Sequence, residues 1–130
     1  MIADTSALIA ILRQEDEAGL FAEIAGNAEN IYVSAANWFE AAIVADRFRD
    51  PTVGRRFDEI CRELSLAIVP LDETQARIAR EAYRDFGKGS GHKAQLNFGD
   101  CFAYALAKSM NEPLLFKGND FSHTDVRSAL

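Results

Sequence analysis

The pattern of hydrophobic residues near the N-terminus predicts a short strand followed by a helix. Met1 to Ala3 form a largely apolar run, and apolar residues then recur at helical spacing over residues 7–12. Thr5 or Ser6 would cap this helix, since a hydroxyl oxygen can accept a hydrogen bond from the first backbone amides. Asp4 is therefore expected at the junction between strand and helix.

The same alternation of strands and helices continues along the chain. Further helices are predicted over residues 17–25, 34–48, 53–64, 73–86 and 97–110, and further strands over residues 31–33, 66–69, 113–116 and 125–128. Short apolar strands between helices are typical of a parallel sheet that is covered on both faces. We predict an α/β fold, a three-layer sandwich with a mainly parallel sheet of four to five strands, forming a single domain over residues 1–130.

Four acidic residues occupy positions that this fold would bring to one edge of the sheet. Asp4 directly follows the first strand, and Asp120 follows the fourth. Glu40 lies near the second turn of the helix after strand two, and Asp100 lies in the first turn of a helix that begins at Asn97. Ligands of such folds bind at the carboxyl ends of the strands. If strands one, two and four are neighbours, the carboxylates converge, and their mutual repulsion calls for a cation.

The residue types at this edge predict a magnesium or manganese site and phosphodiester hydrolysis. Carboxylate ligands without histidine or thiolate favour Mg²⁺ or Mn²⁺ over zinc. Such an ion lowers the pKa of a bound water and neutralises charge on the phosphate oxygens. We predict Asp4 as the central ligand, Asp100 and Asp120 as further ligands, and Glu40 as a ligand or as the residue that orients a water. Two neighbouring hydroxyl groups could hydrogen-bond a ligand carboxylate, those of Thr5 and Ser6.

Each of these acids also has an ordinary structural interpretation. Asp100 could complete a capping box with Asn97, and Asp4 could cap the first helix itself. Asp120 could be a turn residue, and Glu40 could face solvent. Only the joint placement of the four acids favours a metal site.

The net charge of −6 at first argues against a nucleic-acid enzyme, because phosphate binding usually leaves a basic surface. Acids gathered around bound cations would account for much of this excess. A basic rim would still be needed to hold RNA, and its candidates are Arg80, Arg84, Lys88, Lys93 and Lys117. The same charges could equally form a solvated surface.

Several other side chains admit both a functional and a structural interpretation. Three glycines in residues 87–93 predict a mobile loop that matches no nucleotide-binding motif. His92 in this loop could act as a general acid, but a loop histidine is more often solvent-exposed, and the same holds for His123. Trp38 and Phe39 could stack on a base, although such a pair more often belongs to a core or a subunit surface.

The two cysteines and the hydropathy of the chain bear on its compartment. Cys61 and Cys101 fall in predicted helices without metal-ligand spacing, which predicts reduced thiols in the core. Such thiols suit a reducing cytoplasm. No apolar run approaches the thickness of a bilayer, and no basic segment precedes an apolar one at the N-terminus. We expect a cytoplasmic protein without a membrane anchor.

Four segments carry a resemblance to a known family: MIADTSALIAIL, SAANWFEAAIV, NFGDCFAYALAK and PLLFKGNDFSHTDV. In this order they resemble the motifs of the VapC toxins, the PIN-domain ribonucleases of bacterial toxin–antitoxin pairs, over essentially the whole chain. The resemblance implies a PIN fold whose four acids fall on Asp4, Glu40, Asp100 and Asp120, with Asn119 beside the last. It also implies Mg²⁺- or Mn²⁺-dependent cleavage of single-stranded RNA, a homodimer, and inhibition by a VapB-type antitoxin that covers the acidic pocket.

Two other functions remain open from the residues alone. An aspartate after the first strand also suits an aspartyl-phosphate phosphotransfer protein, although the haloacid-dehalogenase pattern would place a second aspartate where Ser6 stands. A PIN-like module without catalysis could bind RNA or a protein partner. The presence of all four acids argues against this second alternative.

Overall fold

The computed structural model covers residues 1–130 and is built around a parallel sheet of four strands. The strands are β1 (Ile2–Ala3), β2 (Tyr32–Ser34), β3 (Ala67–Val69) and β4 (Leu114–Leu115). Their order across the sheet is β3-β2-β1-β4, and every pair is parallel. Since β1 lies between β2 and β4, the predicted neighbourhood of strands one, two and four is confirmed.

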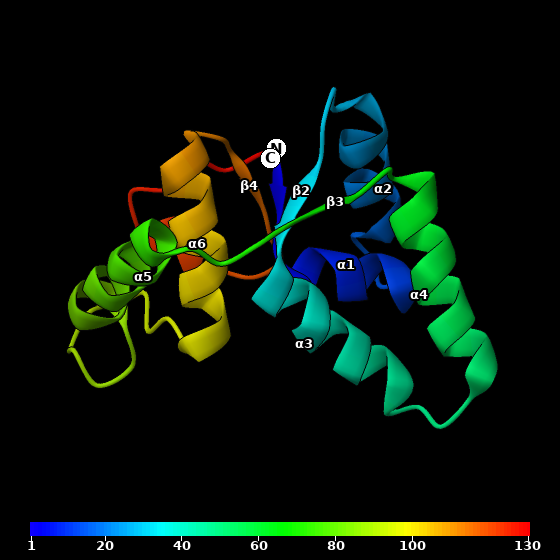
Figure 1. Ribbon diagram of the computed structural model, residues 1–130, viewed down its shortest axis with the longest axis horizontal. Helices are drawn as coiled ribbons and strands as arrows, with labels where there is room; N and C mark the ends of the chain where they lie inside the picture. Colours follow the sequence, from blue (N-terminus) through cyan, green and yellow to red (C-terminus); the bar gives the residue numbers. More distant parts are fainter.

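Six α-helices cover the sheet in two layers, which Figure 1 shows on either side of the strands. They are α1 (Thr5–Leu12), α2 (Ala18–Asn27), α3 (Ala35–Asp46), α4 (Pro51–Glu63), α5 (Glu73–Phe86) and α6 (Phe98–Met110), and a 3₁₀ turn, η1 (Phe121–His123), follows β4. The helices α5 and α6 form one layer, and α1 to α4 form the other. The predicted three-layer α/β sandwich is confirmed.

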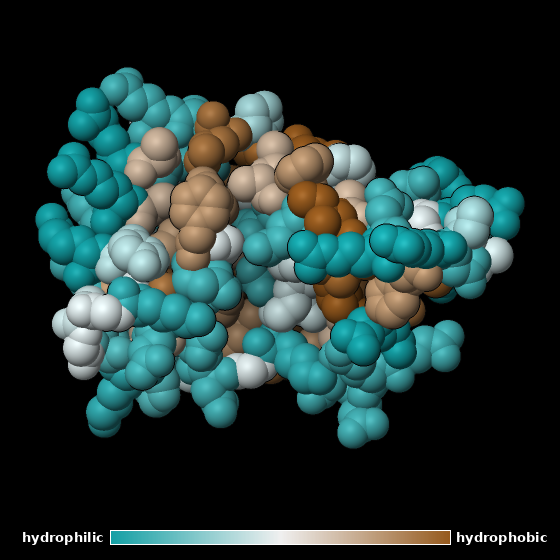
Figure 2. Space-filling model, turned by 90° about the horizontal axis from the view of Figure 1, so that it is seen from below, coloured by the Kyte–Doolittle hydropathy of each residue, from teal (hydrophilic) through white to brown (hydrophobic).

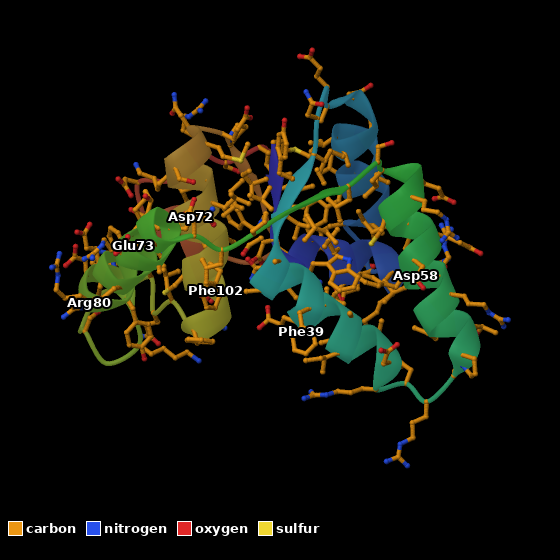
Figure 3. All side chains as sticks on the ribbon, viewed as in Figure 1. Phe39, Asp58, Asp72, Glu73, Arg80 and Phe102 are labelled. Carbon is orange, nitrogen blue, oxygen red and sulfur yellow. The ribbon has the colours of Figure 1, made fainter.

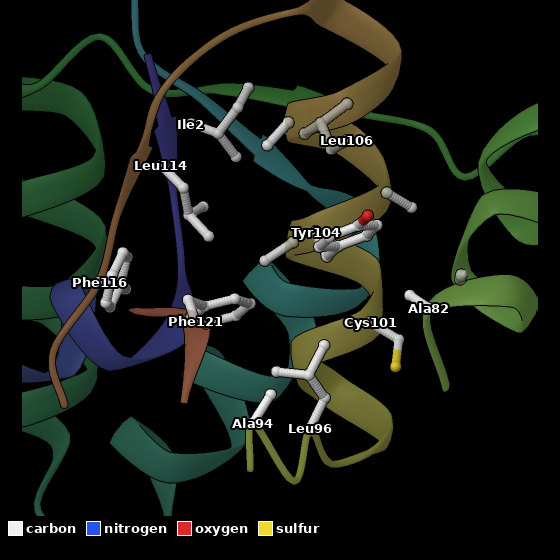
Figure 4. Close-up of a cluster of buried hydrophobic side chains, with 14 residues drawn as sticks. Ile2, Ala82, Ala94, Leu96, Cys101, Tyr104, Leu106, Leu114, Phe116 and Phe121 are labelled. Carbon is white, nitrogen blue, oxygen red and sulfur yellow. The ribbon is translucent and has the colours of Figure 1, made fainter. Parts of the chain in front are cut away.

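The central strand β1 contributes to a separate core on each face of the sheet. Ile2 packs with Leu106 of α6 and Leu114 of β4 in the larger core, which Figure 4 shows. Ala3 packs on the other face with Leu8 of α1 and Phe57 of α4. Successive residues of a strand point to opposite faces, so this two-residue strand anchors both helical layers.

The predicted fifth strand is shorter in the structure than the sequence suggested. Only a single bridge joins Leu114 to Ser128, flanked by hydrogen bonds from Leu114 N to Arg127 O and from Ala129 N to Leu114 O. Because β4 itself spans only two residues, it offers no longer edge for the C-terminal tail to pair with.

The predicted glycine-rich loop is closed at its base. A bridge joins Gly87 to Leu96, and the Nδ1 atom of His92 accepts a hydrogen bond from Ala94 N at 3.1 Å. The His92 ring also meets Phe86 edge to face. His92 therefore has a structural role within this loop.

Both cysteines are free thiols, with Cys101 buried and Cys61 half-buried. The longest helices fall short of the length and apolarity that crossing a bilayer requires.

Candidate active site

A cavity of about 680 Å³ opens at the carboxyl edge of the sheet, between α1, α3 and α6. Asp4, Glu40 and Asp100 line it, so the topology brings together three of the four predicted acids. Figure 2 views the molecule from this edge. The convergence arises because β1, β2 and the turn before α6 all end at the same side of the sheet.

Asp4 combines burial with a capping role. Its backbone amide donates to Leu115 O at 3.0 Å, which fixes it beside the end of β4. Its Oδ2 atom accepts hydrogen bonds from Ser6 N at 2.9 Å and Ser6 Oγ at 2.6 Å. The prediction that Thr5 or Ser6 caps this helix is therefore wrong, and the cap is Asp4, the alternative role of this residue, because its carboxylate accepts the hydrogen bond of a free amide of the first turn. Burial raises the pKa of Asp4 more than the Ser6 hydrogen bonds lower it, and the charge of Glu40 adds to the rise.

Asp100 is likewise held by the start of a helix. Its Oδ2 atom accepts from Asn97 N at 2.9 Å, while Asn97 Oδ1 accepts from Asp100 N at 2.8 Å. This reciprocal pair is the capping box that the sequence offered as an alternative role. Burial raises the pKa of Asp100 to about 6, and the charges of Asp4, Asp120 and Glu40 contribute to the rise.

Glu40 reaches the cavity from the middle of α3 and lies over the backbone of α6. A Cβ atom built on Gly99 would stand only 2.5 Å from Oε2 of Glu40 and 2.9 Å from its Oε1. One turn earlier on α3, the fully buried Asn37 donates from Nδ2 to Gly99 O at 2.9 Å. The two helices therefore approach closely at the residue that precedes Asp100.

Sequence reasoning missed Gly99 as part of this site and gave Asn37 no role. A signal was available, because a glycine inside a helix is unfavourable unless something demands its small size. Gly99 stands in the first turn of the helix that carries Asp100.

The remaining predicted site residues lie at the margin. Asp120 is exposed at the start of η1 and does not line the cavity, although its charge reaches Asp100. The Asn119 side chain is exposed, and only the backbone oxygen of this residue accepts a hydrogen bond, from Ser122 N. The Thr5 hydroxyl donates to Asn37 O at 3.2 Å and not to a carboxylate. Of the two predicted hydroxyls, only that of Ser6 hydrogen-bonds an acid of the site.

The donor set fits a hard divalent cation in its chemistry. Asp4, Glu40, Asp100 and Asp120 form no ion pair. The only basic residue that lines the cavity is Arg47. The carboxylates do not make a closed shell by themselves, since no three His, Cys, Asp or Glu side chains lie close enough to hold an ion. An ion bound here would complete its shell with water and substrate oxygens, as Mg²⁺ commonly does.

None of the basic residues proposed for an RNA-binding rim lines this cavity. Lys117 pairs with Glu15 at 2.7 Å and with Glu17 at 3.2 Å, so its charge is already neutralised. Arg84 pairs with Asp85 at 2.8 Å. Both basic side chains are therefore paired with acids of the same chain: Arg84 with its neighbour in the sequence, and Lys117 with acids that the fold brings close to it.

The other basic residues proposed for the rim are solvent-exposed on or next to α5. Arg80 lines a separate hollow of α5 with Arg77, Glu81 and Arg84. Lys88 and Lys93 are exposed in the glycine-rich loop and form no ion pair. Neither His92 nor His123 lines the acidic cavity.

The two aromatic residues beside Glu40 have different surroundings. Trp38 is half-buried, with its ring 6.2 Å from that of Phe57, and belongs to the core of α3 and α4. Phe39 is 60% exposed and lines the cavity.

Comparison with known proteins identifies a family. A sequence model of the PIN domain matches residues 1–127. Two curated relatives, ribonuclease VapC28 of Mycobacterium tuberculosis and the VapC ribonuclease Mb0625 of Mycobacterium bovis, are each 55% identical over 130 residues, which is 100% of this chain and 98% of theirs. Ribonuclease VapC42 of M. tuberculosis is 43% identical over 129 residues, covering 99% of this chain and 98% of its own.

Two solved structures share the fold at low sequence identity. A toxin–antitoxin complex from Klebsiella pneumoniae superposes with a TM-score of 0.70 at 17% identity, over 95% of this chain and 92% of that chain. VapC20 of M. tuberculosis, a toxin that cleaves the sarcin–ricin loop, gives a TM-score of 0.71 at 15% identity, over 97% and 98%. At these identities the likeness concerns the fold alone.

Proposed function

Because the chain belongs to the PIN domain family, and within it to the VapC group, we propose that it is a divalent-metal-dependent endoribonuclease that cleaves single-stranded RNA. The observation that carries this proposal is the cluster of electrostatically coupled carboxylates without any ion-pair partner. Like charges held together in this way are stabilised by a bound cation.

In the proposed mechanism, Asp4 and Asp100 are the main ligands of Mg²⁺ or Mn²⁺. Each uses Oδ2 to cap its helix, which fixes the carboxylate and leaves Oδ1 for the ion. Glu40, facing them from α3, completes the site or orients a water, and Asp120 approaches from the outer margin. When bound, the cation would activate a water molecule and neutralise charge on the scissile phosphate.

A cleavage assay with single-stranded RNA tests this proposal. We expect cleavage in the presence of Mn²⁺ or Mg²⁺, none with EDTA, and a loss of at least about a hundredfold in Asp4→Asn, since ligand positioning supports the whole reaction. Glu29→Gln is the matched control, because Glu29 is an exposed acid that precedes β2, at the opposite edge of the sheet. Cleavage by a folded Asp4→Asn variant at the rate of the parent would refute the mechanism.

We further propose that the protein is the toxin of a toxin–antitoxin pair, forms a homodimer, and is inhibited by a VapB-type antitoxin that covers the acidic cavity. The names of its relatives and the Klebsiella toxin–antitoxin complex support this assignment. Brief expression followed by sequencing of RNA ends would reveal the cut sites. Co-expression of a small open reading frame adjacent to the gene should abolish those cuts if it encodes the antitoxin.

The alternatives are distinguished by simple assays. A phosphotransfer protein would be labelled by acetyl phosphate, whereas a non-catalytic module would retain RNA without turnover. The haloacid-dehalogenase pattern would place a second aspartate two positions after Asp4, where Ser6 instead donates hydrogen bonds to the Asp4 carboxylate.

A further inference from the structure

One wall of the acidic cavity is apolar and exposed. Phe39 and Ile43 of α3 are 60% and 37% exposed, and Phe98 at the start of α6 is 77% exposed. All three line the same cavity as the acids, together with Phe102. Figure 3 shows Phe39 and Phe102 on facing sides of the gap between α3 and α6, and Figure 2 shows apolar side chains on both sides of a more hydrophilic centre.

The ring of Phe98 is held in place although it is exposed. It packs edge to face against Phe102, with ring centroids 4.8 Å apart and an interplanar angle of 89°. This geometry is a favourable aromatic arrangement. Since Phe98 is the first residue of α6 and Asp100 the third, the ring stands within one helical turn of a proposed metal ligand.

An unpaired basic residue lines the same cavity. Arg47 follows α3 directly, is exposed, and takes part in no hydrogen bond or ion pair between side chains. A guanidinium group suits a phosphate oxygen. The cavity thus offers carboxylates, flat apolar side chains and a free positive charge, three features that match the phosphates and bases of a single strand.

We infer that Phe39 and Phe98 stack on a base of the RNA beside the cleaved bond, while Arg47 contacts a neighbouring phosphate. This inference rests on the proposed ribonuclease function and names how that site would hold its substrate. The aromatic wall is continuous with the acids, and a cavity of about 680 Å³ lies within the size range of sites for small organic ligands. Single-stranded RNA is therefore the occupant that accounts for all three features together.

Binding and cleavage measurements on the full chain test the inference. The probe is an unstructured, fluorescein-labelled RNA of about ten nucleotides, bound in Ca²⁺ and cleaved in Mn²⁺. Phe39→Leu and Phe98→Leu should each weaken binding by about tenfold and raise KM more than they lower kcat, since base stacking is lost while the acids remain. Phe48→Leu is the matched control, because Phe48 is 46% exposed but does not line the cavity.

A modified RNA distinguishes stacking from a general loss of structure. Replacing the base at the cut site by an abasic sugar should weaken binding to the wild-type protein by a similar factor. The same abasic RNA should cause little further loss of binding in the Phe98→Leu variant, because both changes remove the same interaction. Fully additive losses, or unchanged binding by both phenylalanine variants, would overturn the inference.

Two further outcomes separate this inference from the proposed function. Binding that depends on Phe39 and Phe98 without any cleavage would support stacking and refute the ribonuclease function. If Phe98→Leu instead changes the oligomeric mass in size-exclusion chromatography and leaves RNA binding intact, the apolar wall contacts a second copy of the chain and the inference is wrong.

Discussion

A carboxylate at the first turn of a helix accepts hydrogen bonds from amides that have no partner within the helix, and it interacts favourably with the helix dipole. Asp4 does this for α1 and Asp100 for α6. Burial nevertheless raises the pKa of both residues. The caps fix the two carboxylates in place without neutralising them, which leaves each available to a cation.

Gly99 permits the approach of Glu40, and this leads to a prediction for Gly99→Ala. The new Cβ would stand 2.5 Å from Oε2 of Glu40, so the flexible carboxylate must move away. We expect RNA cleavage to fall by at least about tenfold, because small displacements at a catalytic centre have large effects on rate. The melting temperature should not fall, since alanine favours a helix by up to about 1 kcal/mol over glycine.

Gly26→Ala is the control for this variant. Gly26 lies in α2, and no heavy atom outside its neighbours would come within 4 Å of an added Cβ. It should show the same gain in helix propensity with unchanged cleavage. Equal activity of Gly99→Ala and the parent would mean that the position of Glu40 over Gly99 has no catalytic consequence.

At the scale of single residues, the sequence predicted where the acids of the site lie but not which side chains form ion pairs with one another. The positions of Asp4, Glu40 and Asp100 followed from strand ends and helix periodicity, because topology alone brings them to one edge. The ion pairs of Lys117 with Glu15 and Glu17 could not be predicted, since they join segments about a hundred residues apart whose side-chain directions depend on packing.

At the scale of elements, α6 is joined to the C-terminal tail by a polar cluster. Tyr104 donates its hydroxyl to Oδ1 of Asp125 at 2.6 Å, and Lys108 donates to Oδ2 at 2.9 Å. These two hydrogen bonds hold the pKa of Asp125 below its usual range. The tail beyond Asp125 is also held by its bridge to β4 and by hydrogen bonds from Arg127 to Asn111, so this cluster is one of several attachments.

This cluster gives a pH-dependent prediction for Asp125→Asn. Because the pKa of Asp125 is lower in the folded state than in the unfolded state, its contribution to stability is full above the unfolded pKa and is lost as the pH falls through the folded pKa. At about pH 7 the variant should be less stable, by no more than about 1 kcal/mol because the pair is largely exposed. Urea unfolding should show this difference vanishing in strong acid.

Tyr104→Phe removes the shorter of the two hydrogen bonds to Asp125 and is the second single variant of a double-mutant cycle. Combining it with Asp125→Asn should cost less than the sum of the two single changes, because both remove the same contact. Strict additivity, or a stability difference for Asp125→Asn that persists at low pH, would show that the ionised contact does not stabilise the tail.

The elements themselves were predictable to the extent that local periodicity determines them. The amphipathic spacing of residues 73–86 gave the bounds of α5, and Asn97 marked the start of α6. Strand length was less predictable: residues 125–128 were predicted to form a strand but form one bridge, because their pairing depends on how long β4 is. Pairing partners lie outside the local sequence, so strand extent cannot be deduced from it.

At the scale of the whole molecule, the excess of acidic residues is distributed unevenly. Three acids line one cavity, a fourth influences it electrostatically, and none of the four has a cationic partner within the chain. Elsewhere on the surface, ion pairs such as those of Arg56 with Glu59 and Glu63 offset part of the acidic charge. Negative charge is therefore more concentrated at the carboxyl edge than the net charge of −6 alone would indicate, and this concentration favours the binding of divalent cations there.

This distribution predicts that divalent cations stabilise the folded protein. A ligand that binds only the folded state raises stability by about 2.7 kcal/mol at a concentration one hundred times its Kd. We expect Mg²⁺ or Mn²⁺ to raise the melting temperature in a saturable manner, measured by calorimetry at constant ionic strength with Na⁺ as the control. A rise equal to that caused by Na⁺ would mean that the carboxylates do not bind a specific ion.

The variant Asp100→Asn separates repulsion among the acids from their affinity for a cation. An asparagine oxygen can still accept the hydrogen bond from Asn97 N, so the helix cap is preserved while one negative charge disappears. Without divalent ions the variant should melt at a higher temperature than the parent, because Asp4, Glu40 and Asp120 then meet less like charge. With Mn²⁺ the order should reverse, because the parent gains binding energy that the variant has lost. Glu29→Gln is the control, since it removes one exposed charge away from the site and should change neither melting temperature. If Mn²⁺ raises the melting temperature of Asp100→Asn as much as that of the parent, Asp100 is not a ligand.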